Sequence, residues 1–142
     1  MYSSHLLKLM GIRLASDFVR EPNSRQERLW KAVIIMAFED CFNKGASKAE
    51  AYRKQDAHEW FISGLKDFEN VCYMADIEPL RVRNRYLELL EQGKVDFTEI
   101  QAEWLNYKDA YAKYRCSGDK ENRQRIMEQI TRIREKIVKC GG

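Results

Sequence analysis

The chain has 142 residues, of which 33% are charged and 44% hydrophobic, and its formal net charge is +3. This length allows one core with room for a small appended hairpin, and the mild charge permits nucleic-acid binding without requiring it. Only seven Gly and two Pro accompany the many charged residues, which favours a predominantly helical protein.

The sequence predicts neither membrane contact nor a metal or cofactor site. It contains no run of about 20 apolar residues and no small-residue cleavage site near its start, so we expect a cytoplasmic protein. Neither His5 nor His58 has the spacing from a cysteine that zinc sites require. Two of the four cysteines lie in apolar helical stretches, which indicates core thiols and a reducing compartment. The cysteines, without a Cys-x-x-Cys pair, are Cys41, Cys72, Cys116 and Cys140.

An enzymatic function finds little support in the sequence. The adjacent pair His58-Glu59 is accompanied by no nucleophile elbow and no Gly-rich phosphate loop. A helical histidine next to a tryptophan is more often a packed or surface residue. We therefore assign no catalytic residues.

The first predicted helices occupy residues 3–19 and 25–43. The first of these segments is expected to break near Gly11. Asn23 or Ser24 then caps the second helix, with a glutamate in its first turn. This second helix carries apolar residues on nearly every side from Val33 to Phe38, so we expect it to be the most buried helix.

A third helix is predicted over residues 48–63. Ser47 is its expected N-cap, with Glu50 three residues further on. Gly64 ends the helix. The segment that follows carries the clearest functional signature in the chain, and this third helix would support it.

The segment from Phe68 to Tyr86 satisfies the requirements of a helix-turn-helix. Such a motif needs small or apolar residues where its two helices approach and an unusual backbone angle at the turn. Asp76 lies at the turn, and Asp tolerates the left-handed region better than most other residues. Pro79 suits the first turn of the second helix. The small or apolar contact residues are Val71, Cys72, Ala75, Ile77 and Val82.

This spacing resembles the helix-turn-helix of lactose-repressor-type regulators and of many phage repressors. The chain departs from that pattern twice, because Asp76 replaces the usual Gly and Arg85 stands where an apolar residue is common. Tyr86 can take over the inward contact in place of Arg85. The resemblance implies binding to double-stranded DNA, whereas the alternative is a helix, a tight turn and a helix that only form core.

The second helix of this motif presents the side chains that suit base recognition. On a helix from Pro79 to Leu90, Val82 and Tyr86 begin the buried stripe, which leaves the arginines and Asn84 largely outside. Arg and Asn are the residues that best read guanine and adenine edges in the major groove. The predicted DNA-binding residues are Arg81, Arg83, Asn84, Arg85 and Lys94.

The last part of the chain predicts a helical hairpin. A helix over residues 97–115, capped by Asp96 or Thr98, lines one side with aromatic residues, and a second helix follows over residues 119–139. We expect the isoleucine stripe of the second helix to pack on the tyrosine side of the first. The alternative is that residues 97–139 form a homodimer or higher oligomer. The stripe consists of Ile126, Ile130, Ile133 and Ile137.

Basic residues outnumber acidic ones in that last helix. Such a run is usually a solvated face with charge pairs four residues apart. Its alternative role is contact with phosphates, which adds affinity without sequence choice.

The middle of the chain, residues 29–86, also resembles a group of short uncharacterised phage and prophage proteins. The similarity lies in Leu29-Trp30-Lys31-Ala32-Val33-Ile34, then Ala57-His58-Glu59-Trp60-Phe61, then Asp67-Phe68-Glu69-Asn70-Val71-Cys72, and then Asp76-Ile77-Glu78-Pro79-Leu80-Arg81-Val82-Arg83. The resemblance implies only loosely a phage-linked regulatory or DNA-packaging role.

The sequence therefore predicts an all-α fold with two parts. Residues 1–94 form a multi-helix domain with the helix-turn-helix at 67–90, and residues 95–142 form a C-terminal helical hairpin. The predicted function is a DNA-binding helix-turn-helix protein that regulates transcription. The alternative is a helical assembly or adaptor protein, such as a DNA-packaging or protein-interaction subunit, without sequence-specific reading of DNA.

Overall fold

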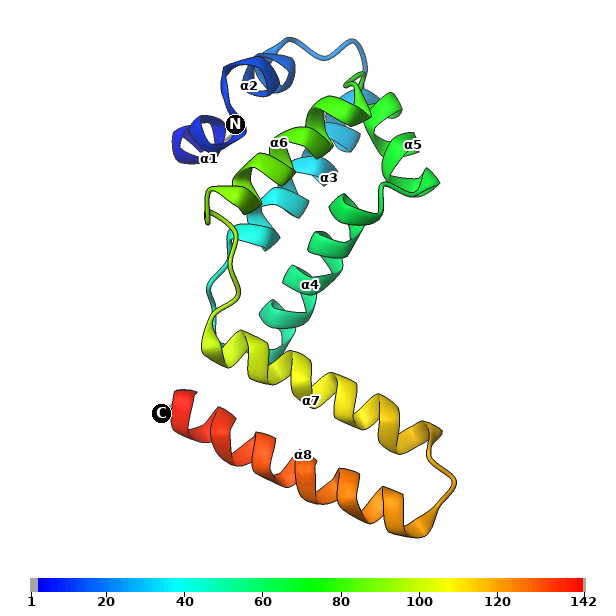
Figure 1. Ribbon diagram of the computed structural model, residues 1–142. Coiled ribbons are helices and arrows are strands. Elements are labelled where there is room, and N and C mark those ends of the chain that lie inside the picture. Colours follow the sequence, from blue (N-terminus) through cyan, green and yellow to red (C-terminus); the bar gives the residue numbers. More distant parts are fainter. Residues whose placement is uncertain (1–2, 142) are drawn as a thin grey trace. The chain divides into compact units, whose positions relative to one another are not determined.

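The computed structural model describes residues 3–141, and over this range the secondary structure consists of eight α-helices and no strand (Figure 1). The predicted all-α fold class is therefore confirmed. The helices are α1 (Ser4–Met10), α2 (Ile12–Val19), α3 (Arg25–Phe42), α4 (Lys48–Ser63), α5 (Lys66–Met74), α6 (Pro79–Glu91), α7 (Glu99–Cys116) and α8 (Lys120–Gly141).

The contacts between residues divide the chain into two units. Unit 1 contains the chain up to Asn43 together with Asp56–Asp96, and unit 2 contains Lys44–Gln55 together with the chain from Phe97 onward. The last of the three boundaries, after Asp96, lies close to the boundary after residue 94 that we expected. The segment Lys44–Gln55, which includes the first half of α4, groups with the hairpin rather than with the helices before it.

Local side chains fix where the longer helices begin. The Ser24 hydroxyl accepts a hydrogen bond from the Glu27 amide at 3.1 Å, and the Ser47 hydroxyl accepts one from the Glu50 amide at 3.1 Å. Thr98 forms a complete capping box with Gln101 at the start of α7. These bonds satisfy amides that lack a partner inside the helix. The structure thus selects Ser24 over Asn23 and Thr98 over Asp96.

The core of unit 1 is rich in aromatic rings. Phe61 lies at its centre, stacked on Tyr86 with 4.4 Å between ring centroids and tilted against Phe38 at 4.6 Å. The helices α1 and α2 also belong to this core, because four of their apolar side chains are almost completely buried. These four are Leu6, Met10, Leu14 and Phe18.

The helix α3 is less completely buried than its composition suggested. Ile34 and Phe38 face the core, but Leu29 and Met36 are mostly exposed. A helix turns one stripe toward a core, and the apolar residues of α3 extend beyond that stripe. The apolar run from Val33 to Phe38 is therefore only partly buried, although α3 still contributes six buried residues.

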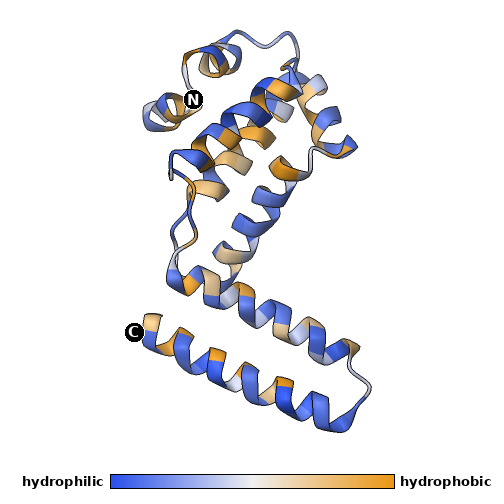
Figure 2. Cartoon of the chain, viewed as in Figure 1, coloured by the Kyte–Doolittle hydropathy of each residue, from blue (hydrophilic) through white to orange (hydrophobic). Residues whose placement is uncertain are grey.

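Unit 2 is built around the α7–α8 hairpin. The isoleucine stripe of α8 packs with Ala110 and with the aromatic residues of α7, and Figure 2 shows the hydrophobic residues of α8 on the side toward α7. The predicted packing of isoleucines on the tyrosine side is confirmed. Buried Lys54 of α4 joins the segment Lys44–Gln55 to this hairpin, because its Nζ donates to Gln101 Oε1 at 2.9 Å.

Candidate nucleic-acid interface

The helix α5, the turn after it and the helix α6 have the backbone expected for the predicted motif. Asp76 has a φ of 57°, in the left-handed region. Its amide donates to the Tyr73 carbonyl at 3.0 Å, and the amide of Ile77 donates to the Cys72 carbonyl at 2.9 Å. This pair of bonds is the Schellman arrangement, which satisfies the last carbonyls of a helix. The prediction that Asp76 lies at a left-handed turn is confirmed.

The residues expected at the contact between the two helices are buried. Cys72, Ala75 and Ile77 are at most 3% exposed, and so are Val82 and Tyr86 of α6. Tyr86 takes the inward position, as expected from the polar character of Arg85. The motif therefore forms a well-packed corner of unit 1, and its value as a DNA-reading element depends on where the arginines of α6 point.

Arg85 does not project into solvent. It is half-buried, and its Nε donates to the carbonyl oxygen of Leu9 at 2.8 Å, in the last turn of α1. The side chain lies against Gly11, where a Cβ atom would be 3.4 Å from Nε. A cation at the C-terminal end of a helix binds carbonyls that lack a helical partner and complements the helix dipole. Arg85 thus caps α1 from α6.

Arg83 has the same kind of role at a second helix. It is half-buried, and its Nη2 donates to the carbonyl oxygen of Ile62 at 3.0 Å, in the last turn of α4. It lies beside Gly64, whose φ of 54° ends that helix. The expectation that Arg83 and Arg85 lie largely outside is therefore wrong, because each arginine binds a helix end that is distant in sequence.

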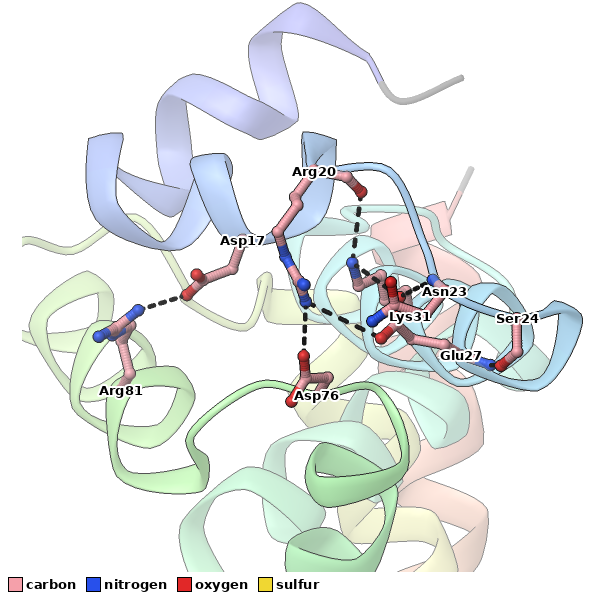
Figure 3. Close-up of polar contacts among 8 residues, drawn as sticks. All are labelled: Asp17, Arg20, Asn23, Ser24, Glu27, Lys31, Asp76 and Arg81. Carbon is pink, nitrogen blue, oxygen red and sulfur yellow. Dashed lines mark hydrogen bonds and ion pairs between the residues drawn. The ribbon is translucent and has the colours of Figure 1, made fainter.

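Arg81 is exposed but paired. Its Nη1 donates to Asp17 Oδ2 at 2.6 Å, so that α6 is joined to α2. Figure 3 shows this pair beside a second group, in which Arg20 lies between Asp76 at 2.9 Å and Glu27 at 3.8 Å. The carboxylate of Asp76 thus binds Arg20, which a Gly at the turn would not do.

The other two predicted DNA-binding residues are exposed and lie apart. Asn84 is on the outer side of α6, whereas Lys94 follows the C-terminal end of the same helix. Asn84 is seven residues before the last residue of α6, so roughly 10 Å of helix axis separates it from the end that Lys94 follows. The structure therefore does not bring the five predicted residues together on one open face.

The positive charge of the chain is concentrated in unit 2. Unit 2 contains 14 Lys and Arg against 8 Asp and Glu, a formal net charge of +6, whereas unit 1 contains 11 against 14, a net charge of −3. The two values add to the +3 of the whole chain. Of the 14 cations in unit 2, all except Lys54 are exposed. The helix-turn-helix corner is thus in the acidic unit.

The tip of the hairpin combines positive charge with an open hollow. This hollow, of about 430 Å³, is lined by residues from the end of α7 and the start of α8, and no carboxylate is among them. The Arg123 guanidinium lies 4.5 Å from the centroid of the Tyr114 ring. The lining residues are Tyr114, Gly118, Lys120, Arg123, Gln124 and Met127.

Sequence reasoning missed the capping roles of Arg83 and Arg85. Gly11 and Gly64 signalled the ends of two helices, but nothing local to them identifies the partner of each end. It also missed the division of charge, because the net charge of the whole chain conceals two opposite contributions. A count on each side of residue 95 does not reveal it, because residues 1–94 carry 15 Lys and Arg against 14 Asp and Glu, and residues 96–142 carry 10 against 8. The asymmetry depends on the grouping of Lys44–Gln55, which has four cations and one carboxylate, with the hairpin.

Comparisons of the chain with protein-family models, with curated proteins and with solved structures found no match. In residues 3–141, no helix has the length and apolar character needed to cross a membrane. Within the same range, no three side chains of His, Cys, Asp or Glu are grouped so that they could hold a metal ion.

Proposed function

We propose that the protein binds DNA and that the exposed cations of unit 2 provide the affinity. The observation that carries this proposal is the net charge of +6 on unit 2 against −3 on unit 1. Neutralisation of phosphates and release of counterions supply most of the affinity of non-specific DNA binding. This electrostatic contribution does not depend on the base sequence, so the proposal does not require the arginines of α6.

The proposal relocates the interface that the helix-turn-helix resemblance implied. Arg83 and Arg85 are engaged with helix ends, and Arg81 is paired with Asp17. Releasing them would leave those helix carbonyls without their partners. Dislodging α1 and α2 would also expose four buried apolar side chains, at a cost of roughly 1.5 to 3 kcal/mol each. The corner is therefore better suited to hold unit 1 together than to enter a groove.

Fluorescence anisotropy with a labelled duplex at low salt tests the proposal. The double variant Lys120→Gln/Arg123→Gln removes two exposed cations from the hairpin tip. We expect weaker binding to every duplex sequence, and a slope of log affinity against log salt that is smaller by roughly 2.

The matched control is the double variant Arg81→Gln/Asn84→Ala, which changes the exposed residues of α6 in unit 1. It should bind as the wild type does. If this variant lost affinity while the hairpin variant retained it, the interface would lie on the helix-turn-helix instead. Absence of binding at low salt in the wild type would reject DNA binding altogether.

A role as an assembly or adaptor protein is the second candidate, and one surface of unit 1 favours it. Tyr73 and Leu80 are 62% and 61% exposed, and they line a hollow of about 250 Å³ together with Phe68. Exposed large apolar side chains around a hollow are typical of protein contacts. In this alternative, Leu80→Glu would abolish binding of a protein partner and leave DNA binding unchanged. Transcriptional regulation and a phage setting remain expectations from the sequence.

A further inference from the structure

The helix α7 carries a row of aromatic rings that pack against the isoleucine stripe of α8 and remain partly exposed. Neighbouring rings of this row meet edge to face, with interplanar angles of 84°, 65° and 76°. We call this row the aromatic ladder, and its successive ring centroids are 5.5, 4.9 and 6.4 Å apart. All four rings are only partly buried, and the first and last are ten positions apart on α7, roughly 15 Å. The ladder consists of Trp104, Tyr107, Tyr111 and Tyr114.

Cations lie against the three tyrosine rings of the ladder. Arg134 donates to the hydroxyls of Tyr107 at 3.3 Å and Tyr111 at 2.8 Å, and the Arg123 guanidinium lies over Tyr114. Lys48 lies 5.7 Å from the centroid of the Tyr107 ring. The hydrogen bond from Arg134 lowers the pKa of the Tyr107 phenol. Burial opposes this change, and the positive charges of Arg134 and Lys48 add to it. Positive groups therefore stand beside successive rings and not only at one end.

We infer that the aromatic ladder is a stacking platform for the unpaired bases of single-stranded nucleic acid, with the bordering cations in contact with its phosphates. This inference rests on the proposed function and deepens it, because it names the form of nucleic acid that unit 2 prefers. Proteins that bind single strands combine a basic surface with aromatic side chains on which bases stack. The ladder and its cations supply both components on one hairpin.

The geometry favours unpaired bases over two other polyanions. In a duplex the base faces are stacked on one another, so the rings would reach only the backbone. An acidic peptide would satisfy the cations but offers no series of planar faces to the rings. At the hairpin tip, Tyr114 and Arg123 line a hollow without a carboxylate, where a base and its phosphate can both be accommodated.

The test compares two forms of the same nucleic acid by fluorescence anisotropy. The probes are an oligothymidylate of about 15 nucleotides and the duplex that it forms with oligoadenylate. The wild type should bind the single strand more tightly. Tyr114→Ala should weaken binding to the single strand roughly tenfold and change duplex binding little, whereas Tyr114→Phe should retain wild-type affinity.

Tyr73→Ala is the control for the loss of any exposed tyrosine, because it removes an exposed ring of unit 1. This variant should bind both probes as the wild type does. If Tyr114→Ala bound the single strand normally, the ladder would not be a stacking platform, although duplex binding could still support the proposed function. If the wild type bound neither probe, the proposed function would fail as well.

Photocrosslinking keeps the inference testable if Tyr114→Ala does not fold. The wild-type protein is irradiated with an oligonucleotide that contains 5-iodouracil, and the modified peptides are identified by mass spectrometry. We expect adducts on the ladder tyrosines. Adducts confined to tyrosines or tryptophans of unit 1, or no adduct despite binding, would overturn the inference.

Discussion

Two arginines of α6 illustrate how the environment of a residue determines its role. Arg83 and Arg85 have the residue type that reads bases, yet each donates to a carbonyl in the last turn of another helix. A charged donor bound to an otherwise unsatisfied carbonyl contributes roughly 1.5 to 3 kcal/mol. Both arginines lie beside glycines, Gly11 and Gly64, whose positive φ angles end the two helices. Their role is therefore structural.

His58 is a residue whose titration should affect stability. His58 is half-buried, and its Nδ1 is 2.6 Å from the hydroxyl of Tyr86, which belongs to the unit 1 core. Burial lowers the pKa of His58, although the nearby Glu59 carboxylate opposes this change. Burial also raises the pKa of the Tyr86 phenol above its usual range, so the hydroxyl keeps its proton and can donate to a neutral histidine.

The lowered pKa of His58 predicts a loss of stability in acid. As the pH falls below about 6.5, the usual value for histidine, the unfolded chain takes up the proton before the folded protein does. The stabilising contribution is present above that pH and is lost as the pH falls through the folded-state pKa. The free energy of unfolding, measured by urea at pH values of about 7.5 and 5.5, should fall further for the wild type than for His58→Gln. An equal decrease in the free energy of unfolding for the wild type and His58→Gln would contradict this prediction.

At the scale of the element, the turn between α5 and α6 depends on one left-handed residue. The wild-type Asp76 combines a tolerated left-handed φ of 57° with an ion pair to Arg20. That pair is exposed, with 43% and 64% of the two side chains accessible, so it contributes at most about 1 kcal/mol. The Schellman turn therefore depends mainly on the backbone angle.

This dependence predicts an order of stability for two variants. Asp76→Ala should be less stable than Asp76→Gly by about 1 kcal/mol, because Gly adopts a positive φ without steric strain. Urea unfolding followed by circular dichroism measures the difference. Asn70, an exposed residue within α5, provides the control, because there the Gly variant should be the less stable one by a similar amount. If the Ala variant were the more stable one at position 76 as well as at position 70, the turn would not be strained.

At the scale of the whole molecule, the two units carry opposite charge. The sequence-based expectation of DNA binding considered a net charge of +3 for the chain, a value that conceals +6 on one unit and −3 on the other. Charge of one sign on a contiguous unit acts on a polyanion more strongly than the same total spread over the molecule. This distribution moves the proposed interface from the helix-turn-helix to the hairpin unit.

The packing of the hairpin also predicts that residues 97–139 do not dimerise the protein. The four isoleucines of the α8 stripe are at most 9% exposed, because they pack against α7. In the described part of unit 2, Val138 is the one large hydrophobic side chain that is mostly exposed. Multi-angle light scattering should give the same mass for the wild type and Val138→Glu. A dimer that dissociates on this substitution would restore the hairpin as an oligomerisation element.

Much of the helical structure was predictable because its causes are local. Ser24, Ser47 and Thr98 act within three residues of their own positions, and Gly11 and Gly64 end helices through their own backbone angles. The turn at Asp76 is similar, since its hydrogen bonds reach back no further than Cys72. The isoleucine stripe of α8 was predictable because helical periodicity places its members on one face.

By itself, the sequence determined the all-α fold, the principal helix boundaries, the left-handed turn and the hairpin, because each follows from interactions between residues close in the chain. Only the tertiary structure decided what the arginines of α6 bind. Arg85 and Leu9 are 76 positions apart, and Arg83 and Ile62 are 21 apart. Periodicity can indicate that a side chain lies outside its own helix, but it cannot tell whether solvent or the end of another helix lies there.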